Sequence, residues 1–195
     1  MVVLAALPCV AAKPTAASEL DKVRARMASA GAVEAVFTIN GGEGPVQGNA
    51  VIAGNSFRLT TPQVEVWFDG KTQWTLLNST EEVSISKPDA DEIMSANPFA
   101  ILTAHSNYYT ARRLSDSGGR TRVELKPRDK SSIISSFIIM IDPATNWPSA
   151  LVLKFSDNRK IDVVIDRIGA TKAKSKSFFT YNPSQHPAAE IIDLR

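Results

Sequence analysis

The sequence predicts a mainly β fold in one domain, with a long antiparallel sheet and two helical segments. Three observations indicate this fold. Short apolar segments recur between turns that contain Gly, Asn or Asp, as in an antiparallel meander. Apolar residues occupy alternate positions in many segments, so one sheet face is buried and the other is wet. Asp69-Gly70 is the strongest short-range hairpin signal, because glycine accepts a positive φ without steric cost.

Size, charge and cysteine content limit the classes of function. With 195 residues, of which 44% are hydrophobic, the chain can build one domain with a real core. The formal net charge of +2 gives no general argument for nucleic-acid binding. The single cysteine, Cys9, leaves the rest of the chain without an internal disulfide or a thiolate metal site.

The first 12 residues are uncharged and apolar, but a membrane-spanning helix needs about 20 residues. They resemble the hydrophobic region of a secretory signal, with a small-residue cleavage site at 10–12. The basic n-region is missing, so either the true start lies upstream or the segment is not a signal. Acylation of Cys9 is a less favoured alternative, because Pro8 precedes it. We expect an exported protein, with a truncated signal segment at 1–12 and a single domain at 13–195.

The first element is expected to be a helix over residues 13–31. Ser18 is the expected N-cap, and the acidic residues after it favour the helix dipole. Gly31 is the expected stop. A narrow apolar stripe at helical spacing should pack against another element: Leu20, Val23 and Met27.

From residue 32 the apolar period changes to two, which indicates strands. Residues 88–104 break this pattern with two short helical pieces, the first starting near Pro88. Strands then return, and residues 182–195 are expected to form a tail. The expected strands are 32–39, 50–52, 57–60, the two sides of the Asp69-Gly70 turn, 83–86, 108–114, 121–126, 136–141, 149–155, 160–168 and 177–181.

The Asp69-Gly70 hairpin concentrates aromatic area, since it carries two of the chain's three tryptophans. We expect Phe68 to face the interior and Trp67 the opposite side, with Trp74 facing the interior across the turn. Such a hairpin forms the wall of a core or of an apolar pocket.

The search for catalytic or metal-binding residues favours structural interpretations throughout. His105 and His186 have no second histidine or cysteine at metal-ligand spacing, so each is interpreted as structural or exposed. Asp162 and Asp166 share the polar face of one strand, which favours a solvated face over a catalytic pair. There is no nucleophile elbow and no glycine-rich phosphate loop. We therefore predict no catalytic residue, no metal and no cofactor.

A basic run crosses one expected hairpin between residues 112 and 130. Nucleic-acid binding would require interleaved aromatic residues for base stacking, and only Tyr108 and Tyr109 are near. A solvated outer face is the favoured interpretation, and a contact patch for an acidic partner is the alternative. We expect no nucleic-acid partner.

The order of motifs resembles the LolA-type outer-membrane lipoprotein carriers. The similarity rests on Phe68-Asp69-Gly70-Lys71-Thr72-Gln73-Trp74, then Glu82-Val83-Ser84-Ile85, then Asn97-Pro98-Phe99, and on the ending with Glu190-Ile191-Ile192-Asp193. It extends from about Ser18 to the C-terminus.

This resemblance implies an incomplete, half-open antiparallel β-barrel with a helical lid over an apolar cavity. It implies a periplasmic carrier or chaperone that shelters lipoprotein acyl chains, with an inner-membrane releasing complex and an outer-membrane acceptor as partners. The expected ligand is an acyl chain or another lipid. The expected lining is Phe37, Val51, Phe57, Leu59, Val66, Phe68, Trp74, Leu76, Ile93, Phe99 and Leu102.

One departure concerns the lid. Family members of the best-studied type place Lys-Arg-Pro before a strand, and its arginine holds the lid closed. Residues 52–57 here are Ile-Ala-Gly-Asn-Ser-Phe, and Arg58 lies beyond them. The lid-closing role is therefore not carried over.

Two other functions remain as alternatives. One is a regulator that senses lipids or lipoproteins, or an acceptor anchored through Cys9, on the same fold. The other is an enzyme, which would need a perturbed acid or nucleophile in a cleft, and the sequence offers none.

Overall fold

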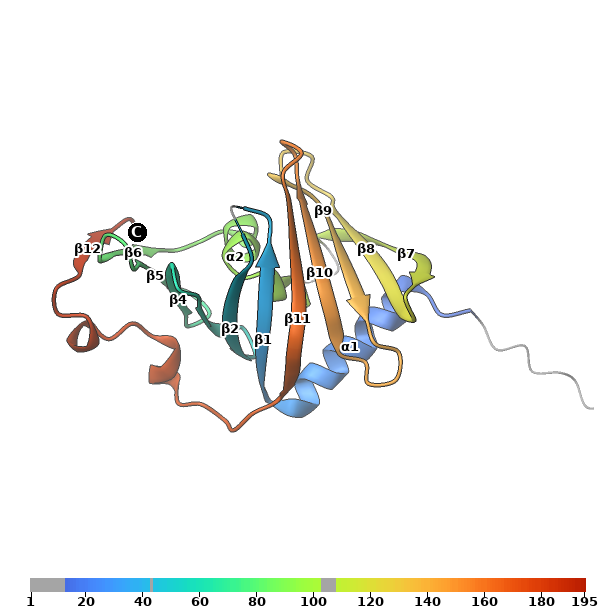
Figure 1. The fold of residues 1–195 in the computed structure, drawn as a ribbon, viewed down its shortest axis with the longest axis horizontal. Helices are drawn as coiled ribbons and strands as arrows, with labels where there is room; N and C mark the ends of the chain where they lie inside the picture. Colours follow the sequence, from blue (N-terminus) through green and yellow to red (C-terminus); the bar gives the residue numbers. More distant parts are fainter. Residues whose placement is uncertain (1–12, 43, 103–107) are drawn as a thin grey trace, which may run out of the picture.

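A computed structural model describes residues 13–42, 44–102 and 108–195. Residues 1–12, which include Cys9, and the segment that contains His105 lie outside the described residues. The chain forms one open sheet of 12 strands with helices against it (Figure 1). The sheet is mainly antiparallel and does not close into a barrel, because β12 and β7 form its two edges.

The sheet order is β12-β6-β5-β4-β3-β2-β1-β11-β10-β9-β8-β7. The long antiparallel pair β1–β11 therefore joins two arms, one of early strands and one of late strands. The strands are β1 Ala32–Asn40, β2 Val46–Ala53, β3 Ser56–Thr60, β4 Val64–Phe68, β5 Gln73–Leu77, β6 Glu82–Ser86, β7 Tyr109–Ser117, β8 Arg120–Pro127, β9 Ile134–Ile141, β10 Pro148–Phe155, β11 Lys160–Ala170 and β12 Glu190–Asp193.

Helix α1 (Ala16–Ala30) lies across β1, β11, β8 and β7. Its N-cap is Thr15 and not Ser18: the Thr15 hydroxyl accepts from the Ser18 N–H, and the Ser18 hydroxyl occupies the reciprocal position of the capping box. The expected stop at Gly31 is confirmed, with φ of +71°. The predicted apolar stripe is buried, and Val23 is 1% exposed.

The insert between β6 and β7 consists of α2 (Ala90–Ala96) and the 3-10 helix η1 (Pro98–Leu102). Two helical pieces were expected here, and both are present. Asp89 caps α2: its side chain accepts from the Glu92 N–H, and the Glu92 side chain accepts from the Asp89 N–H. Figure 1 shows α2 between the two arms of the sheet. We call residues 88–102 the insert.

The C-terminal segment differs from the expectation. Residues 177–181 do not form a strand: the 3-10 helix η2 (Lys176–Phe179) occupies this region, followed by η3 (Pro183–Gln185). The expected tail contains β12, which pairs in parallel with β6. The segment runs from the end of β11 to the far edge of the sheet, red in Figure 1. We call residues 171–195 the C-terminal strap.

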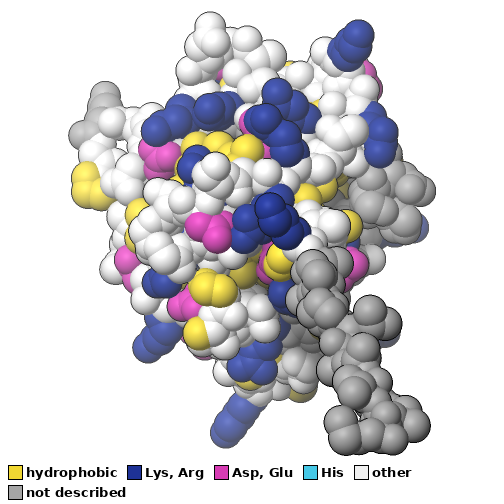
Figure 2. Space-filling model, turned by 90° about the vertical axis from the view of Figure 1, so that its right-hand side faces the viewer, with side chains coloured by type: hydrophobic (Ala, Val, Ile, Leu, Met, Phe, Trp, Pro, Cys, Tyr) yellow, Lys and Arg dark blue, Asp and Glu magenta, His cyan; other side chains and the backbone are white. Residues whose placement is uncertain are grey.

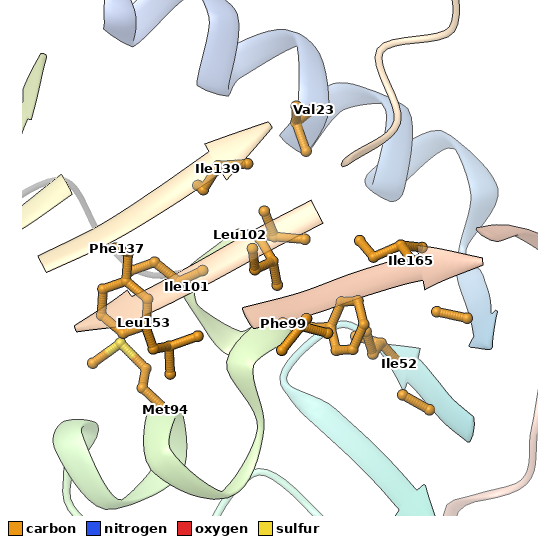
Figure 3. Packing of buried hydrophobic residues seen from close by; sticks show 14 of the residues in the cluster. Val23, Ile52, Met94, Phe99, Ile101, Leu102, Phe137, Ile139, Leu153 and Ile165 are labelled. Atoms are coloured by element: carbon orange, nitrogen blue, oxygen red, sulfur yellow. The ribbon is translucent and has the colours of Figure 1, made fainter. Parts of the chain in front are cut away.

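The core lies between the concave face of the sheet, α1 and η1. Phe99, Ile101 and Leu102 of η1 are at most 1% exposed. Figure 3 shows them among side chains of α1 and of the central strands, including Val23 and Ile165. Each Å² of apolar surface removed from water stabilises the fold by about 25 cal/mol. The fully buried side chains of η1 therefore anchor the insert on the sheet.

Candidate functional site

The concave face carries an open groove of about 1050 Å³ between the early strands and the insert. We call it the main groove. Strand residues form its apolar wall, while Pro88, Ala96 and Pro98 of the insert cover it. Its volume matches the upper range of ligand pockets, about 300–1,000 Å³. The apolar wall consists of Ile39, Val46, Leu59, Val64, Val66, Leu153 and Ile161.

A second pocket of about 310 Å³ lies on the other side of α2. We call it the small pocket. Glu92 and Ala96 line the main groove, whereas Ile93 and Met94 line the small pocket. Helix α2 is therefore the partition between the two spaces. The remaining apolar lining of the small pocket includes Ile52, Phe57, Phe68 and Tyr109.

Aromatic contacts hold the insert on the sheet. The ring of Phe99 lies 5.5 Å from that of Phe37 on β1. Phe37 can lie flat over β2 because its neighbour there is Gly48, where an added Cβ would stand 2.5 Å from the Phe37 Cζ atom. Real Cβ atoms do not approach this closely, so a larger residue would displace the ring. The Asn97 Oδ1 atom accepts from the Phe99 N–H at 3.1 Å and fixes the turn into η1.

Tyr109, at the start of β7, contacts α2 from the opposite side. Its hydroxyl donates to the Met94 Sδ atom at 2.8 Å, and its ring meets Phe137 edge-on at 6.1 Å. Burial, followed by the negative charge of Asp91, raises the pKa of Tyr109 to about 12. The phenol is therefore a neutral packing group at ordinary pH.

Sequence comparison assigns the family. The family model described as "Outer membrane lipoprotein carrier protein LolA" matches residues 9–157. The chain belongs to this family. No curated protein sequence matches the chain significantly.

Solved structures share the LolA-like fold at low sequence identity. An uncharacterised conserved protein from Thermus thermophilus has a TM-score of 0.60 at 13% identity, covering 91% of this chain and 98% of that one. A DUF1329 family protein from Desulfovibrio piger has a TM-score of 0.51 at 9% identity, covering 88% and 98%. A LolA superfamily protein from Nitrosomonas europaea has a TM-score of 0.49 at 10% identity, covering 86% and 98%. At these identities the first two likenesses show the fold alone.

Most of the residues expected to line a LolA-like cavity lie on the concave side. Leu59 and Val66 line the main groove, and Phe57, Phe68 and Ile93 line the small pocket. The others are fully buried behind these spaces, in the same core: Phe37, Phe99 and Leu102.

Three expected lining residues lie on the other face, and the expectation is corrected for them. Trp74 pairs directly with Trp67, so both point away from Phe68. Leu76 follows Trp74 by two residues and shares its face. Val51 pairs with Glu34 on one side and Arg58 on the other, opposite to the inward Ile52. The sequence already indicated this shared face. When the loop after Phe68 has an even number of residues, Trp67 and Trp74 fall on the same side of the sheet.

The outward tryptophans belong to a second apolar cluster that the sequence did not reveal. Trp67 is 1% exposed because the C-terminal strap covers it. Its ring lies 5.5 Å from Tyr181 and 5.9 Å from His186, which itself stacks on Tyr181. His186 is therefore a packing residue of this cluster. The remaining buried members are Leu76 and Val83.

Arg58, the arginine near the position where some LolA carriers close the lid, belongs to this outer face. Its Nη2 atom donates to the Glu65 Oε2 atom at 3.0 Å. Its guanidinium lies 5.1 Å from the Trp67 ring and 5.3 Å from the Phe178 ring. Arg58 thus joins the sheet to the C-terminal strap by cation–π contact and does not reach the insert.

The two aspartates of β11 that the sequence offered as a carboxylate pair each contact another side chain. Asp162 pairs with Lys160 at 2.8 Å, and Asp166 accepts from Thr38 at 2.8 Å. Among residues 13–42, 44–102 and 108–195, no group of His, Cys, Asp or Glu is placed to hold a metal ion. Within the same residues, no helix is long and apolar enough to cross a membrane.

The basic run is spread over β7, β8 and the neighbouring turns. Arg112 pairs with Glu124 at 2.7 Å, and Arg113 pairs with Asp116 at 2.9 Å. Figure 2 shows Lys and Arg side chains on this side of the molecule with Asp, Glu and hydrophobic side chains between them. The run is an ordinary solvated face with ion pairs, which contribute little individually.

Proposed function

We propose that this protein is a periplasmic carrier that shelters the acyl chains of lipoproteins, or of another lipid, in the main groove. The observation that carries the proposal is the large apolar concavity beneath the insert, in a chain of the LolA family. Residues 13–195 are proposed as a single lipid-binding unit, with 1–12 acting in export. The proposal includes an inner-membrane donor and an outer-membrane acceptor.

Transfer of an acyl chain into the main groove needs no catalytic group. Burying one CH₂ contributes about 0.8 kcal/mol, so a chain of more than a dozen carbons supplies roughly 10 kcal/mol before ordering costs. Leu59, Val64 and Val66 would contact the chain. The small pocket, with Phe57, Phe68 and Ile93, would accept a second chain or the end of the first when α2 moves.

The test is a matched pair of charge insertions on opposite faces of the sheet. Val64→Lys places an ammonium on the wall of the main groove, while Val164→Lys changes a residue that is 44% exposed on the other face. Native mass spectrometry and displacement of a fluorescent fatty-acyl probe measure binding. We expect Val64→Lys to weaken acyl binding at least tenfold and Val164→Lys to leave it unchanged.

Two results would count against a carrier. One is purification of the wild-type protein from periplasm and membranes always without lipid, combined with no binding of acyl probes. The other is equal binding by Val64→Lys and Val164→Lys, which would place any lipid outside the main groove.

A further inference from the structure

The main groove has two chemically different walls. On its concave floor, β4 presents Val64 and Val66, whereas β5 presents Gln73 and Thr75. Within the groove lining, the change from apolar to polar therefore falls between two adjacent strands; Leu77, the next residue of β5 on this face, is apolar, 44% exposed and outside the lining. If the hydrophobic core continued across this part of the sheet, both strands would carry apolar residues, as β9 and β10 do elsewhere.

The polar residues form a continuous row because of strand register. Gln73 is directly opposite Ser86, and Thr75 is directly opposite Ser84 on β6. Residues directly opposite on antiparallel strands share a face, so their side chains stand next to one another. We call Gln73, Thr75, Ser84 and Ser86 the polar shelf.

Gln73 is the residue of the shelf with an unsatisfied group. It is 9% exposed and lines the main groove. Its Nε2 atom donates to the Thr75 hydroxyl at 3.3 Å, while its Oε1 atom has no hydrogen-bond partner among the described residues. Rotating the amide by 180° would let Oε1 accept from the Thr75 hydroxyl, but it would leave Nε2 without a partner. An unpaired buried amide costs free energy, and its terminal torsion is soft enough to turn toward a group in the groove.

The charge of the groove limits what that group can be. Of the described residues that line it, Glu92 is the only charged one. The Glu92 carboxylate is already used in the capping box of α2. A phosphate or a free carboxylate would lose its hydration here and meet no cation in this lining.

We propose that the polar shelf binds a neutral hydrogen-bonding group at the polar end of an acyl chain, while the chain lies on the apolar wall. Hydroxyl, ester and amide groups have this chemistry, as in a glyceryl ester or an N-acyl amide. The proposal rests on the carrier function and specifies which acylated molecules the main groove selects. Gln73 and Thr75 are the residues that determine this selectivity.

Probes with one acyl chain and different polar ends test the selectivity. Monolauroylglycerol and N-lauroylglycinamide are neutral and represent the ester and amide sources, whereas laurate and lauroyl lysophosphatidic acid are anionic. Affinity is measured at pH 8 by displacement of a fluorescent acyl probe. We expect at least one neutral probe to bind at least tenfold more tightly than either anion. Equal or tighter binding of an anion would overturn the proposal. Binding of none of the four would instead overturn the carrier function.

Variants test the role of the shelf. Gln73→Met keeps the size of the side chain but removes the amide. Gln47→Met is the matched control, because Gln47 is exposed on β2 and does not line the main groove. We expect Gln73→Met to weaken binding of the preferred neutral probe about three- to tenfold, the range of one net hydrogen bond, and to leave laurate binding unchanged.

Unchanged binding of the neutral probe by Gln73→Met would overturn the assignment, as would equal losses for neutral and anionic probes. Thermal unfolding without ligand shows whether the variant is folded, and loss of a buried unpaired amide should keep or raise the midpoint. Thr75→Val provides a second variant with little change in shape, and it should weaken neutral-probe binding in the same direction.

Discussion

Single residues decide how the insert meets the sheet, and Tyr109 shows this most directly. Its side chain reaches from the edge strand β7 to Met94 on α2 and Phe137 on β9. A phenol in this position packs as an apolar ring and gives its one proton to a sulfur atom, a weak acceptor. Ionisation would leave a negative charge among apolar groups and near Asp91, which is why burial raises the pKa of Tyr109 to about 12.

Tyr109 should make the protein less stable at alkaline pH. Between about pH 10 and 12 the unfolded chain releases the Tyr109 proton while the folded protein keeps it, so the free energy of unfolding falls as pH rises. The loss should reach about 1.4 kcal/mol at pH 11. Urea unfolding at pH 9 and pH 11 measures it.

Tyr109→Phe removes this contribution and should lose about 1.4 kcal/mol less than wild type between those pH values. Tyr108→Phe is the control, because Tyr108 is 60% exposed, and it should keep the wild-type dependence. A wild-type slope in Tyr109→Phe would mean that other groups cause the alkaline loss.

At the scale of elements, the C-terminal strap joins distant parts of the chain. It leaves β11 at the centre of the sheet, covers Trp67 with Tyr181 and His186, and ends as β12, which pairs with β6 and forms the edge of the sheet. The new edge strand is only 4 residues long, and short edge strands limit pairing with other molecules. The strap thereby covers the outer apolar cluster and pairs the backbone of β6.

Tyr181→Ala should release the strap. Tyr181 is 9% exposed, and its loss removes the ring contacts with Trp67 and His186, which should cost about 2 to 3 kcal/mol. Trypsin then cleaves faster at the exposed Lys172, Lys174 and Lys176, since proteolysis follows the population of the open form. Tryptophan emission should shift to the red as Trp67 meets water.

Tyr108→Ala serves as the control for this experiment too, because it removes the same side-chain type from an exposed site. Its trypsin pattern and tryptophan emission should match wild type. Unchanged cleavage in Tyr181→Ala would show that β12 alone holds the strap.

The elements that the sequence predicted well are those fixed by local signals. Helix α1 and the insert have apolar spacing, caps and prolines within a few residues, and the strands of both arms have alternating patterns. The strap has no such signals. Residues 177–181 are rich in aromatic residues, as strands are, but Tyr181 packs on a tryptophan more than 100 residues earlier in the sequence. Tertiary contact of this kind overrides local propensity.

Burial of the outer sheet face by the strap also explains why the residues of the candidate site were predicted only in part. Alternation identifies a buried face only if the other face is wet, and here the strap buries part of the outer face. Trp74 and Leu76 are apolar and covered, yet they belong to the outer cluster. Gln73 was interpreted only as part of a family motif, because its unpaired amide becomes visible only when its neighbours are placed.

For the whole molecule, the position of α2 decides whether the main groove and the small pocket stay separate, because residues of this helix line both spaces. Helix α2 has only 7 residues, too few for a helix to be stable alone, and it depends on η1 and on the walls it touches. Helix η1 is anchored by the fully buried Phe99, Ile101 and Leu102. By contrast, α2 contributes the buried Met94 and the partly buried Ile93. Movement of α2 on a fixed η1 would join the main groove and the small pocket without unfolding the core.

Hydrogen exchange should therefore distinguish the two helices. In the ligand-free protein we expect the amides of α2 to exchange faster than those of α1, because regions with little buried apolar contact open at lower cost. Monolauroylglycerol should slow exchange in α2 several-fold, since a chain in the groove supplies the contacts that α2 lacks. Helix α1 lies apart from the main groove and is the internal control, so its exchange should not change. Equal protection of both helices would mean that lipid stabilises the whole fold, and no protection of α2 would mean that lipid binds without the partition taking part.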